Sequence, residues 1–200
     1  MPRDRSAYLP IKRMMDLVLS IISLPIVLPV LLLASIAIRL DTPGPAFFIQ
    51  ERIGQHGRHF RLYKLRTMVA NAEELKASVL DSRTVHFKTL ADPRITRVGR
   101  FLRKTSLDEL PQLFNVIRGE MSLVGPRPTS LNLATYEPWH ERRLDVRPGV
   151  TGLWQVRGRN AMTFDERVKL DLEYIDHLSL ANDLKLLGLT VLVVVKGKGA

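Results

Sequence analysis

The stretch LVLSIISLPIVLPVLLLASIAI, residues 17–38, contains 22 residues without a single ionisable side chain. As a straight helix it would measure roughly 33 Å, enough to cross a bilayer core of about 30 Å. Pro25 and Pro29 lie in its middle, and each removes a backbone N–H and crowds the carbonyl four residues earlier. We therefore expect a membrane helix that breaks near Pro29, with Pro25 contributing to the break.

Basic residues flank this run on both sides. Four precede it, Arg3, Arg5, Lys12 and Arg13, and the other 26 of the 30 follow it. A single span would place one strongly basic flank on the non-cytoplasmic face, against the positive-inside tendency. A helix that enters, breaks and returns to the same face satisfies both flanks. The preferred prediction is therefore a re-entrant membrane helix within residues 1–40.

Two other interpretations of the run were weighed. A buried core helix is one, but an uncharged run of this length is uncommon in a soluble domain. A signal peptide is the other, because the start is basic and residues 35–37 (SIA) resemble a cleavage site. The run exceeds the usual apolar length of about 7–15 residues and contains prolines, which disfavours a signal peptide.

The overall composition narrows the class of protein. The chain has 200 residues, of which 46% are hydrophobic and 25% charged, as in one ordinary globular domain. It contains no cysteine, which excludes disulfides, thiol nucleophiles and cysteine-bound metal centres. The net charge of +10 favours anionic partners, namely nucleic acid, phosphorylated metabolites or an anionic membrane surface.

Residues 41–200 are predicted to form a second unit, a small helix-rich α/β domain on the cytoplasmic side. A Pro/Gly turn cluster at 41–45 separates it from the membrane element. Residues 46–53 and 59–68 have the pattern of two strands joined by a Gly-containing connection, which predicts a β-hairpin. Residues 71–80 are polar and rich in Ala and Glu, and we expect a helix there.

The C-terminal part of the chain carries two further helix signals. Thr163 and Glu166 have capping-box spacing and precede apolar residues at helical intervals. Residues 184–195 are apolar but too short to span a bilayer, so they predict a core helix or an interfacial helix.

The densest chemical signal lies between residues 92 and 128. Five cations fall within eleven residues without a carboxylate among them: Arg94, Arg97, Arg100, Arg103 and Lys104. Asp108 and Glu109 follow at once. One interpretation is a capping box with Ser106 as N-cap and Glu109 three residues later. Because Pro111 is poorly tolerated inside that helix, Asp108 as N-cap is the alternative.

Either way, the two carboxylates are expected at a helix N-terminus beside cations. Opposite charge and hydrogen bonding should keep Asp108 ionised. An ionised carboxylate can act as a nucleophile, or bind Mg²⁺ together with substrate phosphates. From the residues alone, this functional interpretation and that of a capped, salt-bridged helix start both remain open.

Further downstream, three arginines occupy stiff or glycine-containing loops. Arg127 lies between Pro126 and Pro128, which hold the backbone extended and suit a phosphate clamp. Arg147 and Arg159 stand in glycine-containing loops. The chain has no Walker A, GxGxxG, HExxH or GxSxG motif.

Taken in order, several segments resemble the bacterial sugar transferase family, the monotopic polyprenyl-phosphate phosphoglycosyl transferases, in the small type that consists of the catalytic domain. They are Lys12-Arg13 with Asp16, and residues 44–52 (GPAFFIQER), 63–68 (YKLRTM), 92–96 (DPRIT), 102–113 (LRKTSLDELPQL), 121–128 (MSLVGPRP) and 148–153 (PGVTGL). The family's re-entrant helix usually breaks at a Ser-Pro pair; here Pro29 follows Leu28 instead.

The resemblance implies a Mg²⁺-dependent transfer of sugar 1-phosphate from a UDP-sugar to polyprenyl (undecaprenyl) phosphate, with release of UMP, in exopolysaccharide, capsule or glycan assembly. It implies Asp108 as the nucleophile that carries a covalent phosphosugar, with Glu109 as its partner and both as metal ligands. The implied phosphate- and nucleotide-binding residues are Lys64, Arg66, Arg103, Arg127, Arg147 and Arg159.

The resemblance also implies a place and partners for the protein. The expected location is the bacterial inner membrane, monotopic, with the catalytic domain on the cytoplasmic face. Membrane lipids and, in some arrangements, a second copy of the chain are expected partners, and nucleic acid is not. Two other classes were weighed: a basic membrane-surface adaptor without activity, and a nucleic-acid binder, which aromatics at 6% and the absence of a recognised module disfavour.

Overall fold

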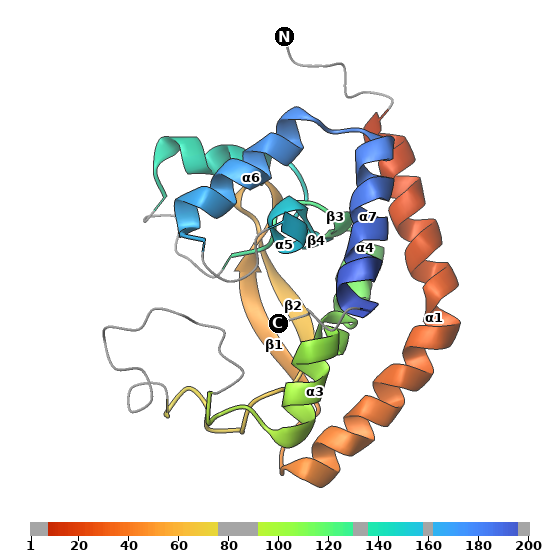
Figure 1. Ribbon diagram of the computed structural model, residues 1–200, viewed down its shortest axis with the longest axis vertical. Helices are drawn as coiled ribbons and strands as arrows, with labels where there is room; N and C mark the ends of the chain where they lie inside the picture. The colour runs from red at the N-terminus through yellow and green to blue at the C-terminus, as the bar shows by residue number, and fades with distance from the viewer. Residues whose placement is uncertain (1–7, 76–91, 130–135, 158–161, 196–200) are drawn as a thin grey trace.

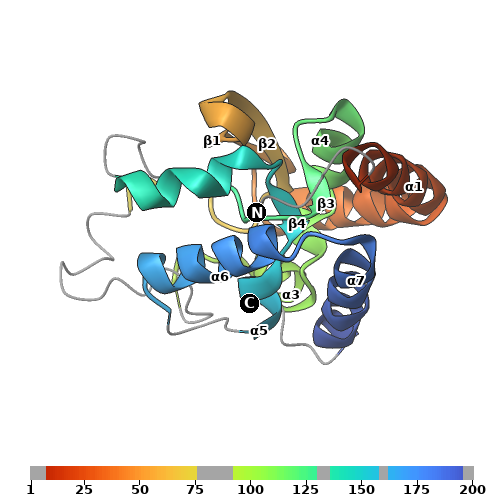
Figure 2. The same cartoon turned by 90° about the horizontal axis from the view of Figure 1, so that it is seen from above.

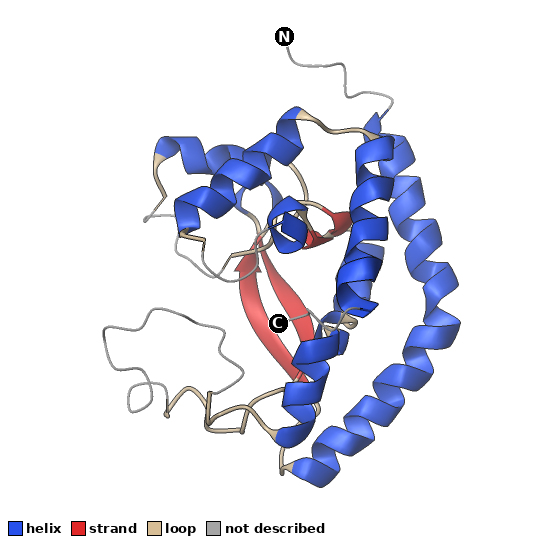
Figure 3. Cartoon of the chain, viewed as in Figure 1, coloured by secondary structure: helices blue, strands red, loops and turns tan. Residues whose placement is uncertain are grey.

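The computed structural model describes residues 8–75, 92–129, 136–157 and 162–195. Helices surround two small two-stranded sheets (Figures 1 and 3). The helices are α1 (Tyr8–Asp41), α3 (Arg97–Thr105), α4 (Gln112–Arg118), α5 (Leu153–Arg157), α6 (Phe164–Asp176) and α7 (Leu180–Val195). The strands are β1 (Phe47–Ile53), β2 (His59–Leu65), β3 (Ser122–Val124) and β4 (Gly149–Thr151), and short 3₁₀ turns lie at Gln55–Gly57, Leu107–Glu109 and Pro138–Asp145. This confirms the predicted helix-rich α/β fold with a β-hairpin.

The hairpin of β1 and β2 forms one wall of the domain. The strands are antiparallel, and Phe48 lies opposite Lys64 while Arg52 lies opposite Phe60. Since side chains alternate between the two faces of a strand, Phe48, Gln50 and Arg52 share one face of β1. The second sheet pairs β3 with β4 in parallel. The chain returns to that pairing after a crossover of 24 residues, 125–148, so the fold depends on contacts distant in sequence.

Helix α1 is apolar on most of its exposed side as well as along much of the side that packs on the domain. A stripe of buried residues faces the domain, with members three, four or seven apart: Lys12, Asp16, Ser20, Val27, Leu31, Ala34 and Ile38. Of the twenty large apolar side chains exposed in the described part of the chain, thirteen belong to α1. By length and composition, α1 is the one described helix that could cross a membrane.

The expected break near Pro29 is not observed. Helix α1 continues from Tyr8 to Asp41 through Pro25 and Pro29, and both prolines lie on the exposed side. It is bent part-way along its length instead, so that it wraps around α7, α4 and α3 (Figures 1 and 2). The Ser23 hydroxyl donates to the Ser20 carbonyl at 2.7 Å, a bond that commonly accompanies helix bending. A bend suffices because proline removes one bond of the ladder and leaves its neighbours intact.

The first half of α1 is tied into the domain by polar contacts. The carboxylate of Asp183, fully buried at the start of α7, accepts from the Tyr8 hydroxyl at 2.8 Å, Lys12 Nζ at 3.0 Å and the Tyr174 hydroxyl at 2.8 Å. Arg13 donates to the last carbonyls of α4, which satisfies a helix C-terminus. Helix α1 is therefore part of the folded domain as well as its apolar surface.

Two predictions for other helices need comment. Residues 71–75 form turns, so the expected polar helix does not begin at Asn71, and residues 76–80 lie outside the described residues. The capping box is confirmed: Thr163 Oγ1 accepts from Glu166 N, and Glu166 Oε2 accepts from Thr163 N at 2.7 Å. The apolar segment predicted at 184–195 lies within α7, which begins at Leu180.

Close packing of α3 on the chain after β2 gives a testable consequence. A Cβ on Gly99 would lie on the Thr67 carbonyl and 2.7 Å from Thr67 Cα, and backbone cannot yield as a flexible side chain can. We expect Gly99→Ala to lower the free energy of unfolding by about 1–3 kcal/mol, measured by denaturant titration.

Gly188 supplies the matched control. It lies in α7, and a Cβ there would meet nothing within 4 Å. Gly188→Ala should leave stability unchanged or raise it slightly, because alanine is the better helix former. Equal destabilisation by both substitutions would contradict a packing origin.

Candidate active site

Residues of the 92–128 segment, among them Asp108 and Glu109, line a cavity of about 620 Å³. It is surrounded by the β1–β2 hairpin, the segment between α3 and α4, Trp154 of α5, and Thr190 and Val194 of α7. Eight charged residues line it, five cations and three carboxylates: Arg52, Lys64, Arg66, Glu73, Arg103, Asp108, Glu109 and Arg127. The surplus of positive charge suits a polyanionic ligand.

Local backbone geometry places Asp108 and Glu109 at this cavity. Helix α3 ends at Thr105, and its C-cap residue Ser106 adopts a left-handed conformation with φ of 57°. The chain then makes a 3₁₀ turn over Leu107–Glu109, and α4 begins after Pro111. Ser106 makes no side-chain cap bond and Pro111 is the N-cap of α4. Both capping predictions for Ser106 and Asp108 were therefore wrong, and Pro111 stands where no backbone N–H is needed.

Asp108 is the unbonded carboxylate of the site. Within the described residues no hydrogen bond reaches its side chain, although Lys64, Arg103 and Arg127 act on it electrostatically. Burial, followed by repulsion from Glu109, raises the pKa of Asp108 to about 6. Opposite charge and hydrogen bonding were expected to keep Asp108 ionised; in the structure, desolvation and a like charge outweigh the cations and raise its pKa. A pKa of about 6 leaves Asp108 mostly ionised at pH 7.

Glu109 organises two of the cations. Its carboxylate accepts from Arg127 Nη1 at 3.0 Å, from Arg127 Nη2 and from Lys64 Nζ at 3.1 Å. Arg103 is held separately, since its Nε donates to Thr67 Oγ1 at 2.9 Å. Lys64, Arg103 and Arg127, which lie far apart in sequence, thus converge around Asp108.

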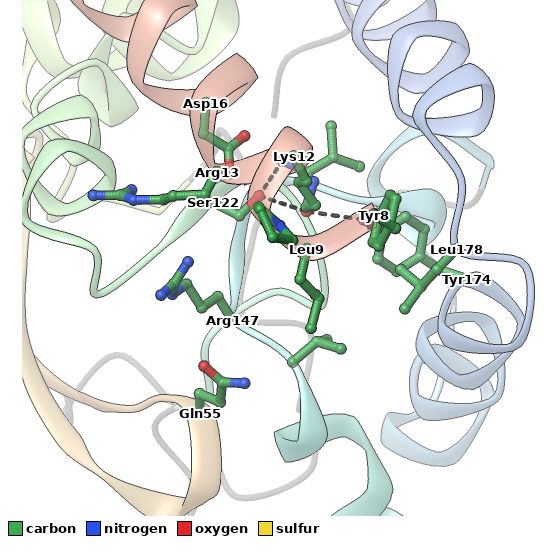
Figure 4. Close-up of a pocket in the computed structure, with 13 residues that line it drawn as sticks. Tyr8, Leu9, Lys12, Arg13, Asp16, Gln55, Ser122, Arg147, Tyr174 and Leu178 are labelled. Carbon is green, nitrogen blue, oxygen red and sulfur yellow. Dashed lines mark hydrogen bonds between the residues drawn. The ribbon is translucent and has the colours of Figure 1, made fainter. Parts of the chain in front are cut away.

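Arg66 and Arg147 have other surroundings. The Arg66 guanidinium donates to the carbonyls of Ile38, Thr42 and Pro43, so it caps the C-terminus of α1 at the edge of the cavity. Arg147 lines a different cavity of about 300 Å³, together with Tyr8, Arg13 and Asp16. Figure 4 shows its guanidinium beside Arg13 and Gln55. The structure does not bring Arg147 to Asp108, and Arg159 lies outside the described residues.

Comparison with known proteins identifies the family. Residues 7–197 match the bacterial sugar transferase family. The chain belongs to this family. The galactosyl transferase CpsE of Streptococcus agalactiae is 47% identical over 199 residues, 97% of this chain and 44% of the relative. The undecaprenyl-phosphate galactose phosphotransferase of Salmonella typhimurium is 45% identical over 95% of this chain and 41% of the relative.

A relative of similar size also exists. The exopolysaccharide production protein ExoY of Sinorhizobium fredii is 38% identical, and the alignment covers 100% of this chain and 93% of the relative. By contrast, the chain spans less than half the length of the two relatives above. The sugar transferase fold therefore accounts for this whole chain but for only part of those longer proteins.

The donor set of this sugar transferase fits Mg²⁺. No group of three or more His, Asp or Glu side chains that could hold a metal occurs within the residues the structure describes. Asp108, however, offers an unbonded carboxylate beside Glu109. Mg²⁺ is commonly held by one or two carboxylates together with substrate phosphates. The pair therefore fits a site that substrate completes.

Sequence reasoning missed several residues of the sugar transferase cavity. Gln50 and Arg52 line it from β1, Thr67 from the chain after β2, and Trp154 from α5. The alternation of the predicted strand 46–53 could have placed Gln50 and Arg52 on one face. Nothing in the sequence pattern indicated that this face and Trp154 would meet Asp108.

Proposed function

We propose that this chain transfers a sugar 1-phosphate from a UDP-sugar to polyprenyl phosphate through a covalent intermediate on Asp108. The observation that carries the proposal is an unbonded carboxylate, largely ionised at pH 7, in a cavity with a surplus of cations. Family membership and the similarity to an undecaprenyl-phosphate galactose phosphotransferase support the lipid carrier and the reaction class.

In the first step an Asp108 carboxylate oxygen attacks the sugar-bearing β-phosphorus of the donor. The new bond joins that oxygen to phosphorus, and the bond from phosphorus to the bridging oxygen breaks. UMP leaves with that oxygen and the electron pair. Lys64 and Arg127, both held by Glu109, and Arg103, held by Thr67, face the developing charge. Phosphoryl transfer depends mainly on such positioning and charge neutralisation.

Asp108 and Glu109 would hold Mg²⁺, which supplies neutralisation of the diphosphate charge when bound. Because both Glu109 oxygens are engaged by Arg127 and Lys64, Glu109 must share or exchange a cationic partner to contribute a ligand. Asp108 needs no such exchange, since its carboxylate carries no hydrogen bond within the described residues.

In the second step a phosphate oxygen of polyprenyl phosphate attacks the same phosphorus. The bond to Asp108 breaks, the carboxylate is regenerated, and polyprenyl diphosphate sugar forms. The apolar outer face of α1 would lie in the bilayer and bring the domain to its lipid substrate. Basic flanks at both ends favour a re-entrant, monotopic placement on the cytoplasmic face of the inner membrane.

Trapping the intermediate tests this proposal. The purified chain in detergent is mixed with Mg²⁺ and each member of a UDP-sugar panel, without acceptor. With the correct donor we expect about one sugar phosphate per chain by intact-protein mass spectrometry, and an equal amount of UMP, as a two-step covalent mechanism requires.

Adding undecaprenyl phosphate should discharge the adduct, and prior addition of EDTA should prevent its formation. UMP release that requires acceptor and leaves no adduct would instead indicate direct displacement. Lipid binding without release of UMP from any donor would support the non-catalytic adaptor.

A further inference from the structure

Arg52 lines the cavity and forms no ion pair with any of the residues that the structure describes. Its Nε and Nη1 atoms are buried and have no hydrogen-bond partner within the residues the structure describes. Only Nη2 is satisfied, by Gln50 Oε1 at 2.5 Å. Buried guanidinium donors are normally paired, because desolvating them without a partner is costly. An arginine in this condition has the properties of a binding group that awaits an anion.

The unsatisfied donors belong to the cavity of Asp108. Phe48, Gln50 and Arg52 share one face of β1, and all three line that cavity together with Lys64 and Arg127. Burial and the neighbouring charge of Arg127 lower the pKa of Arg52 to about 10. Arg127 is neutralised by Glu109, whereas Arg52 forms no ion pair in the described part of the chain. The same cavity is therefore lined by one guanidinium that a carboxylate neutralises and by one without such a partner among the described residues.

Their order relative to the nucleophile indicates which part of a ligand each would meet. Lys64, Arg103 and Arg127 act on Asp108, while the charge that acts on Arg52 is that of Arg127. Lys64, which bonds Glu109, lies opposite Phe48, whereas Arg52 lies opposite Phe60, so Arg52 is four residues farther along the same face of the hairpin. The phosphoryl group that reacts with Asp108 meets the nearer cations. In a nucleotide sugar, a second phosphate lies one bridging oxygen away from the phosphoryl group that reacts.

We propose that Arg52, oriented by Gln50, binds the non-transferred phosphate: first the α-phosphate of the leaving UMP, then the phosphate of the lipid acceptor. This inference rests on the proposed function. Both phosphates occupy one subsite because a double displacement at a single carboxylate brings the acceptor in along the line by which the leaving group departs. Hydrogen bonds from guanidinium donors to phosphate oxygens are charge-assisted and therefore strong, which suits unsatisfied arginine donors to a phosphate ligand.

Product binding tests this subsite without turnover. The full chain in detergent is titrated with UMP and with uridine, which lacks the phosphate. The wild type should bind UMP more tightly than uridine. Arg52→Gln should weaken UMP binding about ten- to hundredfold, the contribution of charge-assisted hydrogen bonds, and leave uridine binding unchanged. Arg52→Lys should restore part of the discrimination, and the melting temperature of each variant checks its folding.

Arg61→Gln is the matched control, since Arg61 is an exposed arginine on the facing strand and does not line the cavity. It should keep the wild-type ratio of UMP to uridine affinity. With adduct preformed on the wild type and on Arg52→Gln, discharge should require a higher concentration of undecaprenyl phosphate in the variant.

Three outcomes would overturn the inference: a wild type that does not distinguish UMP from uridine, an Arg52→Gln variant that keeps the wild-type ratio, or equal loss in Arg61→Gln. Its failure is separable from failure of the proposed function. If the wild type forms the adduct but Arg52→Gln keeps the wild-type ratio of UMP to uridine affinity, only the subsite is refuted. If Arg52→Gln loses that ratio but the wild type forms no adduct, only the covalent mechanism is refuted.

Discussion

Asp108→Asn is expected to lower UMP release by about 10³- to 10⁶-fold, the range seen when a catalytic nucleophile is removed. The amide is similar in size to the carboxylate but is a far weaker nucleophile toward phosphorus. Formation of the sugar-phosphate adduct should disappear with turnover, because the same atom makes the bond.

The same substitution should not destabilise the fold. The Asp108 carboxylate carries no hydrogen bond within the described residues, and burial and Glu109 both disfavour its charge. A neutral side chain removes that cost, so the melting temperature should be unchanged or higher, as at other sites where function opposes stability. Loss of activity at an unchanged or raised melting temperature is the combined signature to measure.

Asp145→Asn serves as the control, because Asp145 is exposed and does not line the cavity. It should keep wild-type turnover. If Asp108→Asn retains turnover, the assigned nucleophile is wrong. If it loses activity only because the protein unfolds, then the carboxylate has a structural role that its geometry does not show.

Asp183→Asn should produce the largest loss of stability, about 3–5 kcal/mol in the free energy of unfolding, as when one partner of a buried ion pair is removed. Asp183 is 0% exposed and accepts bonds from Tyr8, Lys12 and Tyr174. An amide would leave the Lys12 ammonium, which is 8% exposed, without its counter-ion. Since this carboxylate joins α1, α6 and α7, docking of α1 should weaken first.

Denaturant titration of the detergent-solubilised protein, followed by circular dichroism, measures this effect. Asp176→Asn is the control because its pair with Arg142 is about half exposed, at 51% and 50%, and surface pairs contribute roughly 0–1 kcal/mol. A similar small shift for both variants would mean that the buried network does not hold α1.

Much of the local structure followed from short-range patterns. Strand alternation predicted the hairpin, and the spacing of Thr163 and Glu166 predicted the start of α6, because both depend on residues close in sequence. The same holds for Pro111, whose missing N–H limits it to a helix start. Ser106 failed as an N-cap because the chain enters a left-handed turn there.

The arginines show where local patterns lose their predictive value. Arg66 and Arg127 both looked like phosphate ligands, yet Arg66 caps α1 while Arg127 faces Asp108. In the sequence, Arg52 stood only inside a matching segment and was given no role, and in the fold its Nε and Nη1 have no hydrogen-bond partner within the described residues. The function of an arginine depends on which carbonyls and carboxylates the fold brings to it, often from 20 or more residues away.

By itself, the sequence determined an apolar run between basic flanks, a hairpin, and a carboxylate pair beside cations, because hydrophobicity, proline chemistry and capping act over a few residues. Tertiary structure decided that α1 bends without breaking, that the pKa of Asp108 rises, and that Arg52 and Arg127 meet at one cavity. The reason is that electrostatic energy depends on burial and on distance in space, and the linear order of residues specifies neither.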